Sequence, residues 1–277
     1  MNEGLFTAYH SQSAFEAILD HAKAAGSLAV TGVAEGERAF LAAALAHRTS
    51  RPVVLLAPTE LIAGRQAQDL SRLLGDGFAM LPPRELLFSR AAASQESTWQ
   101  RLTALFALAE NKVRVLCLPI EALMDRCLPA DVFRSAILTL AEGAEFPPDK
   151  LMDGLLRAGY ERVAMVEGRG QCAMRGSIVD VFPPTLPEAV RIEFFDTQVD
   201  NIRTFDCISQ RSTGRLRSIR IPPASEGLIT DPKAAADRLE KALSEPGDDP
   251  VPPHRRESPT QKTPISMKPL DDSLEEL

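Results

Sequence analysis

Short apolar runs that alternate with helix-like segments constrain this chain more than any other feature. The runs lie at residues 28–30, 53–57, 78–81 and 113–118, and helical spacing of apolar residues lies at 14–25, 38–46, 60–74 and 94–109. In 94–109, Trp99, Leu102, Leu105 and Phe106 are spaced to face one core. Strands that alternate with helices of this length form parallel sheets covered by helices on both faces. We therefore predict an α/β domain over residues 1–135.

From about residue 136 the pattern changes to strands separated by short turns. A helix is predicted over 148–158, and strands over 162–167, 177–182, 190–195 and 199–205. The separators are rich in Gly, Pro and Asp, which is typical of antiparallel hairpins. The pattern predicts a smaller α+β domain with an antiparallel sheet over residues 136–221, inserted in the α/β fold. Residues 222–243 then return to the α/β domain through a helix at 232–243.

The last segment, residues 244–277, is predicted to be a disordered tail. It holds seven prolines, no aromatic residue and dense charge. Such a composition buries too little apolar area to offset the conformational entropy of the chain. The whole chain has 277 residues and is 44% hydrophobic, which is enough for a core and for two domains.

Charge and cysteine content exclude several classes of protein. A net charge of −7 argues against a dedicated nucleic-acid clamp, although a local basic patch stays open. No C-x-x-C spacing occurs among Cys117, Cys127, Cys172 and Cys207, so free thiols are expected rather than zinc ligands or disulfides. The N-terminus does not have the pattern of a signal peptide, and no apolar run reaches the length of a membrane span. We expect a cytoplasmic protein without a membrane partner.

Residues 28–46 have the pattern of a strand, a turn-rich loop and a helix. A phosphate-binding loop lies between a strand and a helix in this way. A phosphate-binding loop reads G-x-x-x-x-G-K-[ST], and its second glycine aligns with Gly36. In this alignment Thr31, which precedes Gly32, replaces the first glycine. Glu37 replaces the lysine and Arg38 replaces the Ser/Thr. A carboxylate would repel phosphates, and an arginine cannot coordinate magnesium. An ordinary turn or weak anion binding at the helix N-terminus stays open.

This loop indicates a degenerate RecA/P-loop-like domain that is kept as a scaffold. A strand, a Pro-Thr turn and a helix at residues 53–70 are a second, weaker sign of helicase architecture. No acidic pair of the kind that a motor ATPase needs directly follows a strand. We expect no catalytic residue, no metal site and no cofactor, ATP included.

The most specific stretch of sequence lies between residues 159 and 212. It contains VEGRGQCAMRGSIVDVFPP at 166–184 and VRIEFFDTQVDNIRTFD at 190–206. These strings resemble the UvrA-binding domain that UvrB shares with the bacterial transcription–repair coupling factor. A looser resemblance extends over residues 10–240 and includes 81–87. The resemblance to the UvrA-binding domain implies that Arg175, Arg191 and Phe195 contact UvrA. The missing loop lysine and the lack of a long DNA-clasping hairpin favour the coupling factor over UvrB.

The predicted strand at 190–195 supports a binding surface independently of the resemblance. Alternate side chains of a strand face opposite ways, so Val190, Ile192 and Phe194 form an apolar face suited to the core. Arg191, Glu193 and Phe195 then lie on the other face. Arginine and aromatic side chains dominate protein–protein hot spots. The alternative is that a helix or a neighbouring strand covers Phe195.

Other residues of this domain are given structural roles. Gly176 is expected to permit a backbone conformation or a close approach that a side chain would block. Asp180 and Asp206 are expected to close turns or to satisfy backbone groups. A basic run follows, Arg211, Arg215, Arg217 and Arg220, which either contacts DNA or an acidic partner weakly or forms a solvated connection.

These observations predict a protein-interaction module that docks UvrA and has no enzymatic activity of its own. The alternatives are an ATP-dependent DNA helicase or translocase, like the full-length family, and a nonfunctional remnant. The polymerase-binding module and the motor of that family are not expected here, so RNA polymerase is not an expected partner. A frameshifted fragment, a split-gene product and a standalone protein all fit the sequence.

Overall fold

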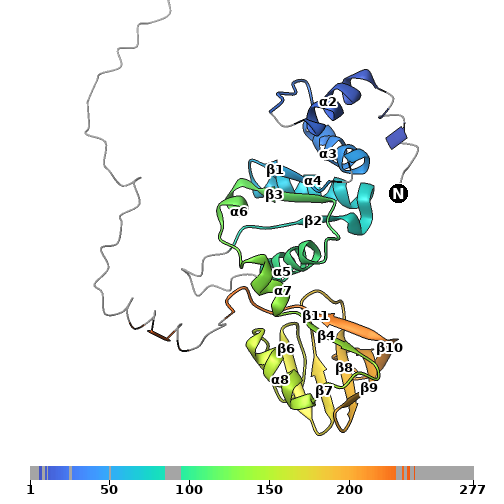
Figure 1. Cartoon of the computed structure of the whole chain (residues 1–277), viewed down its shortest axis with the longest axis vertical. Coiled ribbons are helices and arrows are strands. Elements are labelled where there is room, and N and C mark those ends of the chain that lie inside the picture. Colours follow the sequence, from blue (N-terminus) through green and yellow to red (C-terminus); the bar gives the residue numbers. More distant parts are fainter. Residues whose placement is uncertain are drawn as a thin grey trace, which may run out of the picture. The chain divides into compact units, whose positions relative to one another are not determined.

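The computed structural model describes residues 6–7, 10, 12–24, 27–49, 51–84, 95–228, 233, 236–237 and 240 (Figure 1). The chain separates into two compact units, residues 1–230 and 231–277. The predicted tail at 244–277 and most of the predicted helix at 232–243 lie outside the described residues. In the part of the chain that is described, no helix is long and apolar enough to cross a membrane.

A three-stranded parallel sheet forms the first part of unit 1. The strand order is β1 (Val53–Ala57), β3 (Val115–Pro119) and β2 (Phe78–Met80), and both pairings are parallel. The helices before and between the strands are α2 (Ser13–Lys23), α3 (Glu35–Thr49), α4 (Glu60–Leu74) and α5 (Gln95–Ala109) (Figure 1). A short 3-10 turn, η1 (Gly75–Gly77), leads from α4 into β2. The prediction of a mixed α/β fold with a parallel sheet is therefore confirmed.

Local chemistry explains where these elements begin and end. The Thr59 hydroxyl accepts a hydrogen bond from the backbone N–H of Ile62, which satisfies one free donor of the first turn of α4. Gly75 ends α4 with a φ of +56°, a conformation that favours glycine. Small side chains of α3, among them Ala39 and Ala43, are fully buried and let this helix pack closely on the sheet.

The parallel sheet is not covered on both faces within the described residues. On β1, which lies at an edge, the Val54 side chain is 59% exposed and the Leu56 side chain is 43% exposed. The Leu55 side chain, on the other face, packs against the core. The predicted two-sided burial therefore holds only in part.

The predicted strand at 28–30 is wrong. Residues 27–34 have no regular structure, and α3 begins only at Glu35. Leu28 and Val30 are 45% and 41% exposed. An extended segment becomes a strand only when a neighbouring strand accepts its hydrogen bonds. In the described part of the chain no strand pairs with residues 28–30.

Six strands form an antiparallel meander in the second part of unit 1. They are β5 (Glu161–Arg162), β6 (Gln171–Arg175), β7 (Ile178–Val181), β8 (Ala189–Phe195), β9 (Gln198–Phe205) and β10 (Ser212–Leu216), in the order β10-β9-β8-β7-β6-β5. All neighbours are antiparallel except β5 and β6, which are parallel. This confirms the predicted antiparallel sheet. The predicted strand at 162–167 is wrong beyond Arg162, and β6 and β10 were not predicted.

A two-stranded sheet brings the start and the end of this segment together. β4 (Leu138–Ala141) pairs antiparallel with β11 (Ser218–Ile221), and neither strand was predicted. Two short helices, α6 (Ile120–Met124) and α7 (Ala130–Ser135), lead from β3 to β4. The predicted boundaries at residues 135 and 221 stay predictions, because contacts place all of residues 1–230 in one unit.

One face of the six-stranded sheet, called here the core face, packs on helix α8 (Pro148–Arg157) and on the β4–β11 pair (Figure 1). Leu151 and Leu155 of α8 are fully buried in one core cluster with Val190 and Ile192 of β8. The Tyr160 hydroxyl donates a hydrogen bond of 2.7 Å to the carbonyl oxygen of Pro222. Burial raises the pKa of Tyr160 well above its usual value, which keeps the hydroxyl protonated as a donor.

A buried arginine joins helix α5 to the segment that follows β11. Arg101 is 2% exposed, and its Nε donates to the carboxylate of Glu226, which is 8% exposed. Its Nη1 donates to the carbonyl oxygen of Pro82 at 2.7 Å and lies 3.5 Å from Asp125 Oδ2. The sequence predicted an apolar face for this helix. Leu102 is indeed buried, but the neighbouring buried residue is this arginine.

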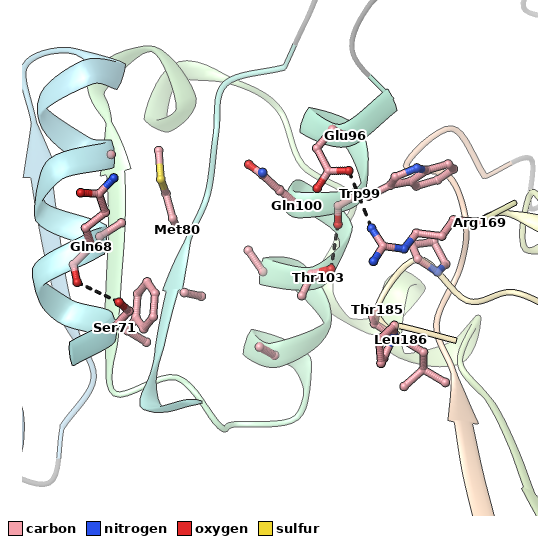
Figure 2. Close-up of a pocket in the computed structure, with 18 residues that line it drawn as sticks. Gln68, Ser71, Met80, Glu96, Trp99, Gln100, Thr103, Arg169, Thr185 and Leu186 are labelled. Atoms are coloured by element: carbon pink, nitrogen blue, oxygen red, sulfur yellow. Dashed lines mark hydrogen bonds and ion pairs between the residues drawn. The ribbon is translucent and has the colours of Figure 1, made fainter. Parts of the chain in front are cut away.

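Aromatic and charged contacts add to this joint. The loop before β6 carries Arg169, whose Nη1 lies 3.7 Å from Glu96 Oε2, and Gly170, where a Cβ would come within 2.8 Å of the Trp99 ring. A cavity of about 710 Å³ lies beside these contacts. Residues of α4, β2 and α5 and residues 184–187 line it (Figure 2). Side chains of α5, of the loop before β6 and of the segment after β11 therefore join the two parts of unit 1 beside this cavity.

Replacing Arg101 by alanine should lower the free energy of unfolding by about 3 kcal/mol, because Glu226 would stay buried without its partner. Arg72→Ala is the matched control, since Arg72 is 78% exposed in its ion pair with Asp69 and should change stability by less than about 1 kcal/mol. Urea denaturation of the purified variants measures both. Equal stability of the two variants would contradict the role given to Arg101.

Candidate protein-binding surface

The face of the six-stranded sheet opposite the core face, called here the outer face, is only partly covered. A small apolar cluster of Val166, Ala173, Ala189 and Phe205 covers the part near the start of β8. Beyond this cluster lie the side chains of Arg175 on β6, Arg191 and Glu193 on β8, and Phe195 at the end of β8. The three residues predicted to bind a partner therefore belong to two strands of one sheet.

One buried carboxylate holds two of these three residues. Asp180 on β7 is 1% exposed and lies opposite Arg191 in the register of β7 and β8. Arg191 Nε donates to Asp180 Oδ1 at 2.7 Å, and Arg191 Nη2 donates to Oδ2 at 2.9 Å. Arg175 Nη2 also donates to Oδ2 at 2.9 Å. The turn-closing role predicted for Asp180 is wrong, because this residue pairs with side chains in the middle of a strand.

The Asp180 carboxylate fixes the Arg191 side chain in one geometry. A two-point arginine–carboxylate pair is directional as well as strong. The Arg191 guanidinium also lies 4.5 Å from the centre of the Phe205 ring and donates to Gln210 Oε1 at 3.2 Å. The Asp180 carboxylate raises the pKa of Arg191, so this side chain is always charged. The Arg191 side chain is 18% exposed and the Arg175 side chain is 51% exposed.

Phe195 is 77% exposed, although the residue before it is buried in the core. The strand continues past a bulge between Glu193 and Phe194 and ends at Phe195, before a turn at Asp196 with a φ of +55°. The alternative that a helix or strand covers this ring is wrong for the described residues. A large exposed aromatic side chain on the same sheet face as two charged arginines has the composition of a binding hot spot.

Gly176 makes the turn between β6 and β7. Its φ is +59°, and a Cβ at this position would have no heavy atom within 4 Å. Gly176 therefore permits a backbone conformation that favours glycine, as predicted. The alternative, that a neighbouring group approaches too closely for a side chain, is wrong. Asp206 closes a turn as predicted, because its Oδ1 accepts the backbone N–H of Ser209 at 2.7 Å. This hydrogen bond lowers the pKa of Asp206.

Ion pairs partly neutralise the basic run at 211–220. Arg215 Nε donates to Glu142 Oε1 at 2.9 Å, and Arg220 Nη1 lies 2.6 Å from Glu110 Oε1. Arg211 and Arg217 are exposed. Two of the four arginines thus pair with carboxylates, which favours the solvated connection over a nucleic-acid contact.

The residues aligned with a phosphate loop lie in an exposed loop at 31–34 and in the first turn of α3. Gly32 has a φ of +80°, and Thr31, Gly36 and Arg38 are exposed. The Glu37 carboxylate accepts the backbone N–H of Ala34 at 3.1 Å. In a working loop such N–H groups face phosphate oxygens. Here a carboxylate of the chain itself takes up one of them.

Thiols and potential metal ligands do not add a second candidate site. All four cysteines are free, and burial raises the pKa of Cys117 and of Cys172 to about 11. Among the described residues, no three His, Cys, Asp or Glu side chains come together in a metal-binding arrangement.

Comparison with known proteins identifies the domain that contains these residues. Residues 138–226 match the family described as UvrB interaction domain. This chain contains a UvrB interaction domain. The domain begins with β4, includes the whole six-stranded sheet and ends at Glu226, the partner of Arg101. Asp180, Arg175, Arg191 and Phe195 all lie within it.

The chain is also related to the transcription-repair-coupling factors over most of its length. It is 36% identical to the Bacillus subtilis protein over 76% of the chain and 32% identical to the Myxococcus xanthus protein over 81% of the chain. The Escherichia coli protein is 32% identical over 68% of the chain. The chain spans only 18%, 20% and 16% of the lengths of these relatives.

Asp180→Asn should lower the free energy of unfolding by about 2 kcal/mol, because a neutral amide cannot replace the charged hydrogen bonds to two arginines. Asp200→Asn on β9 is the control, since Asp200 is exposed and should shift stability by less than about 0.5 kcal/mol. Urea denaturation measures both variants. If Asp180→Asn unfolded at the same urea concentration as Asp200→Asn, the central place of this carboxylate would be disproved.

Proposed function

We propose that this chain docks UvrA through the outer face of its UvrB interaction domain and so acts as an interaction module of transcription-coupled nucleotide excision repair. The observation that carries the proposal is the set of two arginines fixed by one buried carboxylate beside an exposed phenylalanine. The match to the UvrB interaction domain and the names of the relatives support the biological context.

The geometry suits protein recognition for an energetic reason. A long side chain that is mobile in the free protein must lose rotamer freedom on binding, at about 0.5–1.5 kcal/mol. Asp180 already restricts Arg191 and Arg175, so less of this entropy remains to be lost. Phe195 offers an apolar ring that a partner can bury. Together they supply a charged and an apolar anchor.

In the proposed function the α/β part is a degenerate RecA-like scaffold without ATP chemistry. The parallel order of β1, β3 and β2 supports such a fold, although residues 28–30, expected as the strand before the loop, form no strand. Glu37 supports the loss of activity, because its charge and its hydrogen bond to Ala34 oppose a bound phosphate. We propose no cofactor for this part of the chain.

Binding to purified UvrA tests the docking proposal. Arg191→Ala and Phe195→Ala should each weaken the affinity by about 2 kcal/mol, roughly thirtyfold, as is usual for hot-spot residues. Leu156→Ala is the matched control, because Leu156 is 41% exposed on α8, which packs on the core face. Isothermal titration or a pull-down with the same chain variants gives the comparison. Equal affinity of wild type and both surface variants would refute the site.

The competing function is DNA-dependent ATP hydrolysis, favoured by the parallel sheet and the capped Pro58-Thr59 turn after β1. We expect the purified chain to release phosphate from ATP at the background rate, with or without DNA, because Glu37 stands where a lysine is needed. A phosphate-release assay over a range of ATP concentrations measures this. DNA-stimulated turnover that disappears in the Arg38→Ala variant would support the enzyme instead.

A further inference from the structure

The turn that follows β9 carries the most exposed large apolar side chain of the described residues. Ile208 is 95% exposed, more than Phe195. A single exposed apolar residue is common and by itself indicates nothing. Two further properties of this turn, its rigidity and its connection to Arg191, set Ile208 apart.

Hydrogen bonds hold the turn on both sides of Ile208. The backbone N–H of Gln210 donates to the Asp206 carbonyl oxygen at 2.8 Å, and the N–H of Asp206 donates to the Arg211 carbonyl oxygen at 3.0 Å. Asp206 Oδ1 accepts the Ser209 N–H, and Gln210 Nε2 donates to the Cys207 carbonyl oxygen at 2.8 Å. Cys207 packs against the apolar cluster of the outer face. The turn therefore has a fixed shape before any partner binds.

The same turn is connected to the proposed docking surface. Gln210 Oε1 accepts a hydrogen bond from Arg191 Nη2, and Asp180 connects Arg191 to Arg175. A continuous chain of side-chain hydrogen bonds thus runs from β6 through β7 and β8 to the turn. Phe195 stands at the opposite end of β8 from Ala189, which pairs with Phe205 just before the turn.

We infer that Ile208 is a second apolar anchor of the UvrA-docking surface. The inference rests on the proposed function and extends it. Phe205, three residues before Ile208, pairs with Ala189, and six residue steps along β8, about 20 Å, separate Ala189 from Phe195. Ile208 and Phe195 therefore follow opposite ends of β8, and Arg191 lies on the strand between these ends. The partner surface that fits has one apolar recess near each end of this strand and acidic groups between them. This span is within the width of an interface of ordinary size.

Affinity measurements on the whole chain test this inference. Ile208→Ser should weaken UvrA binding by about tenfold or more, because the isoleucine would no longer bury its side chain in the partner. Ile208→Leu keeps the apolar area and should stay within about threefold of wild type. Leu156→Ser, on the helix that covers the core face, should bind as wild type does. Because Ile208 is almost fully exposed, its replacement should leave the thermal unfolding midpoint unchanged.

The double variant Ile208→Ser/Phe195→Ala, compared with the single variants, tests the second anchor separately from the docking proposal. Sites this far apart act independently, so the two affinity losses should multiply. Full UvrA affinity of Ile208→Ser, with weak binding by Phe195→Ala, would overturn the second anchor and leave the docking proposal standing. Wild-type affinity in Arg191→Ala, Phe195→Ala and Ile208→Ser alike would overturn both. Loss of affinity in Leu156→Ser as large as in Ile208→Ser would also overturn the assignment to the outer face.

Discussion

The outer face of the UvrB interaction domain depends on one buried carboxylate. An ionised carboxylate loses several kcal/mol of solvation when it is removed from water, so it is stable only with charged or polar partners. Asp180 has two, Arg175 and Arg191, on the strands to either side of its own. The same contacts that stabilise Asp180 also orient the arginines. The ion pairs of Asp180 therefore both stabilise the sheet and preorganise the surface.

The register of β7 and β8 determines whether this interaction exists. Asp180 lies opposite Arg191, and Val179 lies opposite Ile192 on the core face. A shift of one residue would turn Arg191 toward the core and Ile192 toward solvent. Burial of Val190 and Ile192 against α8 opposes such a shift. Alternation along β8 continues past Glu193, so Phe194 lies in the core and Phe195 in solvent, while the extra residue of the bulge is Asp200 on β9. Packing on one face thus fixes the chemistry of the other.

Sequence patterns predicted the elements whose signals are local. β1 and α4 have the predicted bounds, because an apolar run, a capping threonine and helical spacing lie next to one another. The exposed position of Phe195 follows from alternation along a single strand. β4 and β11 were missed because each is four residues long and they pair across about eighty positions. No local signal connects two such segments.

Long-range charge pairs were missed for the same reason. Arg101 was predicted on a helix without a burial role, since its partner Glu226 lies 125 positions away in the sequence. Asp180 did carry a signal, a carboxylate between two valines of a strand, but only the register shows that Arg191 stands opposite. The strand expected at 28–30 failed because an apolar run forms a strand only beside a pairing neighbour, and the described part of the chain supplies none.

The two parts of unit 1 have separate cores, so a change in the α/β part need not alter the outer face. The cluster beneath the antiparallel sheet and the alanine-rich cluster of α3 and α4 share no residue. Within the described part of the chain, the hydrogen bonds and ion pairs of Asp180 involve only Arg175 and Arg191. A substitution such as Glu37 in the phosphate-loop position therefore changes nothing that Asp180 or its arginines touch. The ion pair of Arg101 and Glu226 connects the two parts and includes neither Glu37 nor Asp180, so it is independent of both positions.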